Sequence, residues 1–300
     1  MKVTVSETVG IMGHKDLAET GVRLPSIGLG IWQYKGGIEP LQTGIALGAC
    51  FIDTAESYDT EEIVGRAIKQ NRKATFLATK VPPRHFRCAD VIAAAEASLK
   101  RLKTDYVDLY QLHWPNYTIP IEETMGAMEQ LVNSGKVRFM GVSNFFVSDL
   151  KSAQKAMSKH KIVSDQVRYN LIDRTVESGL SEYCRQHNIT VIAHSPLATE
   201  FSRIVAKDPE RVINKIARAR SKTAASIALN WCVSKKGVVT IPKANSVEHM
   251  KENCAASDFQ LSPEELRLLD QKVEFGCRGS VAIFLRRIAR QGLQYLCKNQ

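Results

Sequence analysis

The 300-residue sequence has no stretch near the roughly 20 consecutive apolar residues that a membrane-spanning helix needs, so integral membrane association is not predicted. Its opening residues, MKVTVSETVG, contain no apolar signal-peptide core, and export is not expected. The seven cysteines are scattered, odd in number and free of any CxxC pair. This pattern argues against a disulfide framework or a zinc site and favours a reducing, cytoplasmic location.

Motifs of nucleic-acid-binding proteins are also missing, and the GLG at 28–30 does not continue into a GxGxxG dinucleotide fingerprint. The formal net charge is nevertheless +10, and residues 278–300 contain five basic side chains and no acidic one. Anionic small molecules such as phosphates explain this surplus as well as a nucleic acid would, so no nucleic-acid partner is predicted. No group of His, Cys and carboxylate residues has metal-ligand spacing, and no metal site is predicted.

Eight short apolar runs alternate with longer amphipathic stretches. The runs are 26–32, 50–55, 75–81, 106–114, 139–145, 164–170, 190–197 and 238–244. Most show little alternation, which is typical of strands covered on both faces in a parallel sheet. Eight such βα units predict an α/β (β/α)8 TIM barrel, with a doubly wound sheet as the alternative.

The chain has no linker, repeat or low-complexity segment, so a single domain over 1–300 is predicted. Residues 1–23 precede the first barrel strand and are expected to form a small hairpin cap. Residues 276–300 follow the last unit as a basic C-terminal tail with a helical pattern. In the long segment between the last two runs, Asp208 is expected to cap a helix whose first residue is Pro209.

Polar residues stand at the predicted carboxyl ends of the strands, where (β/α)8 enzymes place their chemistry. They are Asp53, Lys80, His113, Ser143, Asn144, Gln166, His194, Ser195 and Lys243. A single such residue most often lines the barrel mouth in contact with solvent. Four titratable groups from three adjacent strands, counting Tyr58 after Asp53, point instead to a reactive site.

We expect Asp53 and Lys80 to form a buried ion pair, because a strand should not end on an unpartnered carboxylate. Tyr58 then lies beside a cation, which favours the phenolate form and lowers its pKa from about 10. The phenol would thereby exchange protons near neutral pH, while His113 holds and polarises a carbonyl oxygen.

Eight segments together resemble the aldo-keto reductases in order and spacing, from about residue 24 to residue 256. They are GLGIWQ, FIDTAESY, ATKV, QLHWPN, GVSNF, QVRYN, HSPL and IPKANSVEHMKEN. The resemblance implies NADP(H)-dependent reduction of aldehydes or ketones without a metal. It also implies a catalytic tetrad in which Tyr58 is the general acid, Lys80 its cationic partner, Asp53 the orienting anion and His113 the carbonyl orienter.

The same resemblance implies further roles by position. Ser143, Asn144 and Gln166 would hold the nicotinamide carboxamide, and Trp32 and Trp114 would be aromatic walls of the substrate pocket. The remaining cofactor-binding positions are His194, Ser195, Leu197, Lys243, Ala244, Asn245, His249, Glu252 and Asn253.

Two departures from the family pattern bear on the cofactor. His194 stands where a tyrosine or another large aromatic residue usually stacks on the nicotinamide, so stacking should be weaker. Lys243 is retained in the phosphate motif, but Ala244 and His249 replace its serine and arginine, which removes a hydroxyl donor and a bidentate fork. A modest preference for NADP(H), with NAD(H) as a second cofactor, is therefore predicted.

The predicted function is hydride transfer between a nicotinamide cofactor and a small carbonyl or alcohol. One alternative is a polyol or sugar dehydrogenase using the same chemistry. Another is a regulatory subunit that senses the nicotinamide cofactor, and the complete tetrad favours the enzyme. The physiological substrate and the oligomeric state are left open by the sequence.

Overall fold

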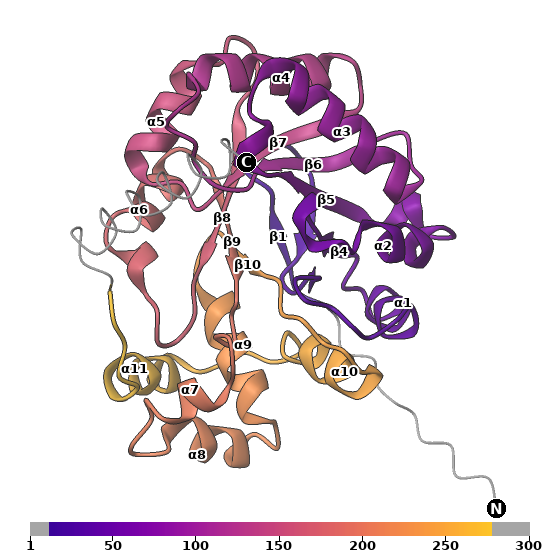
Figure 1. The fold of residues 1–300 in the computed structure, drawn as a ribbon. Coiled ribbons are helices and arrows are strands. Elements are labelled where there is room, and N and C mark those ends of the chain that lie inside the picture. The colour runs from indigo at the N-terminus through magenta and orange to yellow at the C-terminus, as the bar shows by residue number, and fades with distance from the viewer. Residues whose placement is uncertain (1–11, 278–300) are drawn as a thin grey trace, which may run out of the picture.

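A computed structural model describes residues 12–277, and eight parallel strands form the centre of the protein. These strands are β3 (Leu29–Gly30), β4 (Phe51–Asp53), β5 (Phe76–Val81), β6 (Val107–Leu112), β7 (Val137–Ser143), β8 (Ile162–Arg168), β9 (Thr190–His194) and β10 (Val238–Thr240). Neighbours pair in chain order, and a parallel bridge between Ile27 and Thr240 joins the two ends of the sheet. The sheet therefore closes into a barrel, which confirms the (β/α)8 prediction over the doubly wound alternative (Figure 1).

Helices cover the outside of the barrel, most of them between successive strands (Figure 1). Those described are α1 (Glu39–Ala46), α2 (Glu61–Ile68), α3 (Cys88–Leu102), α4 (Ile121–Asn133), α5 (Val147–Lys155), α6 (Leu180–Gln186), α7 (Ser202–Val205), α8 (Val212–Ala219), α9 (Ala224–Ser234), α10 (Val247–Ala255) and α11 (Pro263–Lys272). Because helices cover its outer face, the sheet is buried on both faces, which explains the continuous apolar runs of its strands.

An antiparallel hairpin, β1 (His14–Asp16) and β2 (Arg23–Pro25), covers the amino-terminal end of the barrel. Its fully buried Leu17 and Leu24 belong to one apolar cluster with the first inward-facing residues of the strands. That cluster includes Phe51, Phe76, Leu109, Ile192 and Val239. The hairpin thus seals the end of the barrel opposite the carboxyl ends of the strands.

The predicted start of the helix after Asp208 is wrong. The helix, α8, begins at Val212, and Asp208 lies in the turn before it. The Asp208 carboxylate instead accepts hydrogen bonds from the backbone N–H groups of Val212 and Ile213, both at 2.8 Å. Asp208 therefore still satisfies free donors of the first helical turn, but it does so from four residues upstream.

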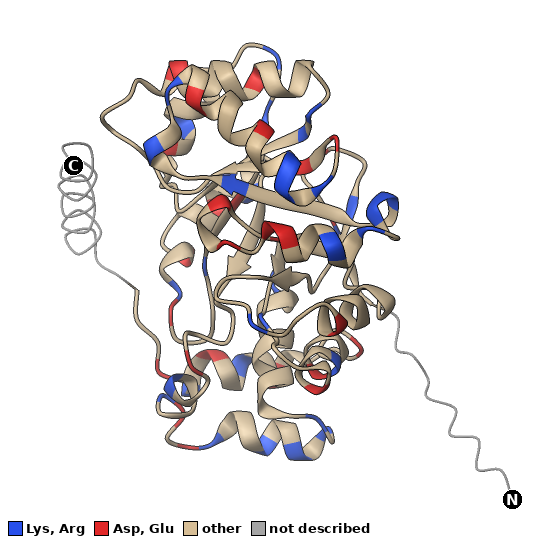
Figure 2. Cartoon of the chain, turned by 45° about the vertical axis from the view of Figure 1, so that its right-hand side comes forward, with Lys and Arg blue, Asp and Glu red and all other residues tan. Residues whose placement is uncertain are grey.

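Basic and acidic positions are interspersed along the outer helices (Figure 2). Among the helices described, none is long and apolar enough to cross a membrane. The five basic residues of the predicted C-terminal tail lie outside the described residues.

Asp165 on β8 has a buried carboxyl group without a charged partner among the described residues. Because its neighbour Gln166 contacts Asp53 inside the barrel, strand alternation places Asp165 on the outer face of the sheet. Neither of its oxygens has a hydrogen bond of normal geometry within residues 12–277. Burial raises the pKa of Asp165 well above its usual value, and the charge of Asp149 adds to this rise, while the nearby Phe145 N–H opposes it. Burial therefore favours the neutral form of the Asp165 carboxyl group in the folded protein.

We expect Asp165→Asn to stabilise the protein at pH 8 by about 1–3 kcal/mol, because an amide cannot ionise. A raised folded-state pKa means that stability is present at low pH and is lost as the pH rises above the value of an unfolded aspartate. Urea unfolding should therefore show that the free energy of unfolding of the wild type falls between pH 5 and pH 8. This fall should be smaller in Asp165→Asn. Asp16→Asn, at an exposed position, is the control and should behave like the wild type. If the free energy of unfolding falls equally in the wild type and both variants, burial of Asp165 is not the cause of the pH dependence.

Candidate active site

Along the strands, the inside of the barrel changes from apolar to polar toward the carboxyl ends. Phe51 and Leu109 lie in the apolar cluster, and Asp53 and Gln111 follow two residues later on the same faces of β4 and β6. Lys80 on β5 and Gln166 on β8 complete this polar layer, and each of the four side chains is at most 2% exposed.

A buried ion pair lies at the centre of the layer. Lys80 Nζ is 2.5 Å from Asp53 Oδ2 and donates a second hydrogen bond of 2.9 Å to the Thr54 carbonyl oxygen. The other carboxylate oxygen, Oδ1, accepts from the side-chain amides of Gln111 at 3.0 Å and Gln166 at 2.7 Å. Burial alone would lower the pKa of Lys80, but the charge and hydrogen bond of Asp53, with those of Tyr58, outweigh it and raise the pKa. Lys80 is thus a permanent buried cation, as the sequence predicts.

Tyr58 lies above this pair at the end of a single 3₁₀ turn, Glu56–Tyr58. Its hydroxyl is 3.5 Å from Lys80 Nζ and 3.3 Å from His113 Nε2, and Lys80 Nζ is 4.9 Å from the centre of its ring. The predicted lowering of its pKa is wrong. Lys80 does lower it, but burial of the phenol is the larger influence, and the pKa of Tyr58 is raised. The phenol is therefore protonated at neutral pH.

His113 follows the last residue of β6 and is half-buried. Its Nδ1 is 3.4 Å from Ser57 Oγ, and its carbonyl oxygen accepts from Asn144 Nδ2 at 3.2 Å. The structure thus brings Asp53, Tyr58, Lys80 and His113 into one cluster at the carboxyl ends of three adjacent strands.

Residues at the ends of β7, β8 and β9 extend this cluster. Ser143 Oγ donates to the Gln166 carbonyl oxygen at 2.8 Å and accepts from Asn144 Nδ2 at 2.8 Å. His194 lies 3.3 Å from Asn144 Oδ1 through Nε2 and 3.1 Å from Ser195 Oγ through Nδ1. Asn144 and Ser195 both have left-handed backbone conformations, with φ of 62° and 52°. This rare geometry for non-glycine residues turns the chain sharply at two strand ends, as is common at ligand sites.

The other predicted cofactor residues form a second group around the loop after β10 and helix α10. Lys243 is exposed and donates to the Gln33 carbonyl oxygen at 3.4 Å, and Asn245 accepts from the backbone of Lys35 at 3.0 Å. Ala244 and Asn253 are buried, and His249 is exposed on α10. Leu197, Glu252 and Trp114 are half-buried, and Trp32, in the loop after β3, is 46% exposed. Among residues 12–277, no group of three His, Cys, Asp or Glu side chains could hold a metal ion.

The profile of the Aldo/keto reductase family matches residues 26–274. The chain belongs to this family. It is 39% identical over 260 residues to methylglyoxal reductase YeaE of Escherichia coli (strain K12), covering 83% of this chain and 91% of that protein. It is 35% identical over 256 residues to glyoxal reductase of Bacillus subtilis (strain 168), covering 83% and 89%. The crystal structure of an aldo-keto reductase from Klebsiella pneumoniae in complex with NADPH matches with a TM-score of 0.83 at 38% identity, covering 89% of this chain and 97% of that one. The protein is therefore an oxidoreductase of the aldo/keto reductase family.

Two residues of this aldo/keto reductase site were not assigned from the sequence. Gln111 contacts Asp53, and its side chain has room because a Cβ on Gly141 would lie 3.1 Å from its Cγ. The signal was present in the run YVDLYQLHW, where alternation places Gln111 on the same inward face as Leu109. Ser246 caps α10 by accepting from the His249 N–H at 3.2 Å, and its position three residues before His249 is typical of an N-cap.

Proposed function

We propose that the protein reduces small aldehydes and ketones with NADPH, with Tyr58 as the general acid. One observation carries the proposal: a protonated phenol lies within hydrogen-bonding range of both a buried cation and an imidazole. The names of the relatives, a methylglyoxal and a glyoxal reductase, support a small dicarbonyl compound as substrate.

The carbonyl oxygen of the substrate would lie between Tyr58 Oη and His113 Nε2, so that both groups donate to it. When bound, the reduced nicotinamide supplies a hydride to the carbonyl carbon. Tyr58 gives its proton to the carbonyl oxygen, which becomes the hydroxyl of the alcohol. Lys80 stabilises the resulting phenolate until solvent returns a proton to it, and general acid catalysis of this kind contributes about 10²–10⁴-fold.

Asp53 keeps Lys80 charged and in place, while Gln111 and Gln166 occupy its second oxygen. Because all of these groups are buried, their positions are set before substrate arrives. Such preorganisation is what makes electrostatic stabilisation of a transition state effective.

The residues present fit a nicotinamide cofactor. Ser143, Asn144 and Gln166 offer hydroxyl and amide groups of the kind that hold a carboxamide, directly beside the catalytic cluster. Lys243 precedes the N-terminus of α10, where the helix dipole also favours an anionic phosphate. The NADPH complex of the Klebsiella pneumoniae enzyme supports NADP(H) as the cofactor. NAD(H) would be a second, weaker cofactor, because Ala244 and His249 stand where the family's serine and arginine would hold the 2′-phosphate.

Oxidation of a polyol would use the same residues in reverse, and cofactor ratios would set its direction. A regulatory subunit that only senses the cofactor would not need a buried Lys80–Asp53 pair beneath Tyr58. The complete catalytic cluster therefore favours an enzyme.

Tyr58→Phe should lower kcat for aldehyde reduction about 10²–10⁴-fold, because the variant loses the proton donor and keeps the ring. NADPH affinity, measured by fluorescence titration, should change little. Tyr183→Phe, on the outer helix α6, is the matched control. Near-normal turnover by Tyr58→Phe would contradict the mechanism.

The raised pKa of Tyr58 predicts a characteristic pH dependence. Reduction needs the protonated phenol, so its kcat/KM should be flat through neutral pH and fall only above about pH 10. Alcohol oxidation needs the phenolate and should rise over the same range. A phenolic limb near pH 7 would overturn the raised pKa, and profiles of His113→Gln separate an imidazole limb from a phenolic one.

Lys243→Ala should weaken NADPH binding roughly 5- to 20-fold more than NADH binding, because Lys243 would contact the 2′-phosphate that NADH lacks. Lys236→Ala is the control, since this exposed lysine precedes the same strand at the opposite end of the barrel. Equal losses of affinity for both cofactors would refute the phosphate role of Lys243.

A further inference from the structure

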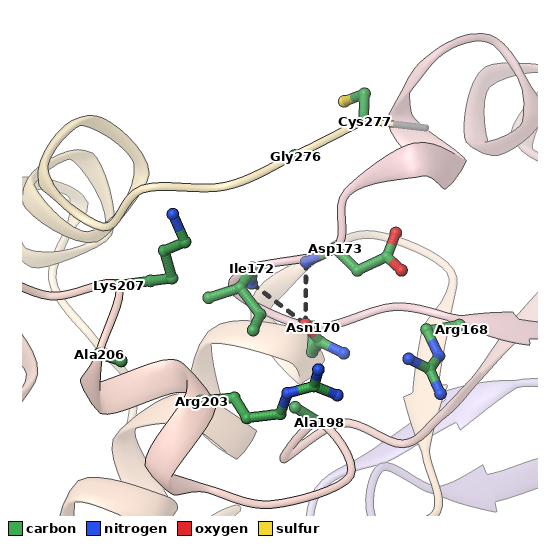
Figure 3. Close-up of a pocket in the computed structure, with 10 residues that line it drawn as sticks. All are labelled: Arg168, Asn170, Ile172, Asp173, Ala198, Arg203, Ala206, Lys207, Gly276 and Cys277. Carbon is green, nitrogen blue, oxygen red and sulfur yellow. Dashed lines mark hydrogen bonds between the residues drawn. The ribbon is translucent and has the colours of Figure 1, made fainter. Parts of the chain in front are cut away.

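The catalytic cluster has different surroundings on the two sides of the barrel mouth. On one side, the loops after β8 and β9 and the segment at Gly276 line a cavity of about 520 Å³ (Figure 3). The loop after β9 also contains Ser195 and Leu197, so this cavity lies on the side proposed for the cofactor. Strands β4 and β5 stand across the closed barrel from β8 and β9, and the segments that follow β4 and β5 surround Tyr58.

The hydroxyl of Tyr58 is held only loosely by its own hydrogen-bonding partners. It lies 3.5 Å from Lys80 Nζ and 3.3 Å from His113 Nε2. Both distances are longer than a typical N···O hydrogen bond of about 2.9 Å. Tyr58 is the last residue of the 3₁₀ turn Glu56–Tyr58. The position of this turn therefore decides where the proton donor lies.

Glu56, the first residue of the turn, anchors it to the segment after β5. Its carboxylate oxygen Oε1 accepts a hydrogen bond of 2.7 Å from Arg84 Nη2, and His85 Nδ1 lies 3.1 Å from the same oxygen. Only 12% of the Glu56 side chain is exposed. Because a carboxylate loses most of its hydration when it is buried in this way, Glu56 depends on these two partners and is fixed by them.

The segment after β5 is a rigid support for this anchor. Pro82 and Pro83 restrict its backbone, and Asn116 Nδ2 donates to the Pro83 carbonyl oxygen at 2.8 Å. The segment continues directly from β5, the strand that carries Lys80. Glu56 thus connects the turn of the proton donor to the strand of the buried cation.

The same turn also contacts the third member of the cluster. Ser57 Oγ, in the middle of the turn, is 3.4 Å from His113 Nδ1. A shift of the turn would therefore change the distances from Tyr58 Oη to Lys80 Nζ and to His113 Nε2 together. Misplacement of a reacting group by about 1 Å can cost about 10²-fold in rate.

We propose that Glu56 is a positioning residue, which holds the Tyr58 turn against the end of β5 through Arg84 and His85. This inference rests on the proposed reductase function and adds a residue to its machinery. Glu56 acts through Tyr58 and takes no part in the chemistry itself. Its loss should slow proton transfer and leave the binding of NADPH unchanged.

Glu56→Ala should lower kcat for methylglyoxal reduction roughly 5- to 50-fold and change KM less than about threefold, because the turn loses its anchor. Glu56→Gln should retain most of the wild-type kcat, since its amide oxygen still accepts from Arg84. Glu96→Ala removes an ion pair with Lys136 on the outside of the barrel and is the matched control. An unchanged kcat in Glu56→Ala, with Tyr58→Phe impaired, overturns the positioning role and leaves the reductase function intact.

A double-mutant cycle separates positioning from a general structural effect. In a Tyr58→Phe background the proton donor is already gone, so adding Glu56→Ala should lower the residual kcat less than about twofold. A further loss as large as in the wild-type background would show that Glu56 does not act through Tyr58 and would overturn the proposal. NADPH affinity should be the same in all variants, and its loss in Glu56→Ala would overturn the proposal by placing the effect at the cofactor.

The anchor can also be removed from its other side. The double variant of Arg84→Ala and His85→Ala should lower kcat to an extent similar to Glu56→Ala, and combining all three changes should add little. A normal kcat in the double variant, or additive losses in the triple variant, would mean that Glu56 acts through other contacts and would overturn the proposal.

Discussion

The ion pair between Lys80 and Asp53 is the interaction on which the rest of the site depends. Two charges buried this deeply are stable only when each is fully partnered, and removal of one would leave the other uncompensated. Thr54, directly after β4, supplies one of the remaining hydrogen bonds, and Gln111 on β6 and Gln166 on β8 supply the others. The barrel must therefore close with the correct register for the pair to exist, and once it has closed, Lys80 lies fixed beneath Tyr58.

The barrel separates stability from chemistry along its axis. Its lower interior is apolar and is sealed by the β1–β2 hairpin through Leu17 and Leu24. The polar layer follows two residues further along the strands. Above it, at the strand ends, lie His113, Asn144 and His194. Side chains of a strand alternate between its two faces, so successive inward-facing residues are two positions apart. The apolar core and the polar site are therefore neighbouring layers of the barrel interior. This arrangement lets the loops vary around a cluster that the strands hold in place.

The eight strands and the meeting of Asp53, Tyr58, Lys80 and His113 were both predictable because their signals are local. Apolar runs mark buried strands, and polar residues at the ends of those runs must meet at the same edge of a parallel sheet. The pKa of Tyr58 was predicted with the wrong sign, because a sequence shows the neighbouring lysine but not how deeply the phenol is buried. The start of α8 was also misplaced, since the Asp208 carboxylate reaches the first helical turn from outside the helix.

By itself, the sequence determined the order of the βα units and the residues at the strand ends, because hydrophobic periodicity and strand-end position are properties of neighbouring residues. Tertiary structure alone decided which side chains share a space. Gln111 reaches Asp53 because Gly141 leaves room for it. Burial and charge pairing depend on such meetings between distant segments, so the electrostatics of the site follow from the closed barrel and not from any one stretch of chain.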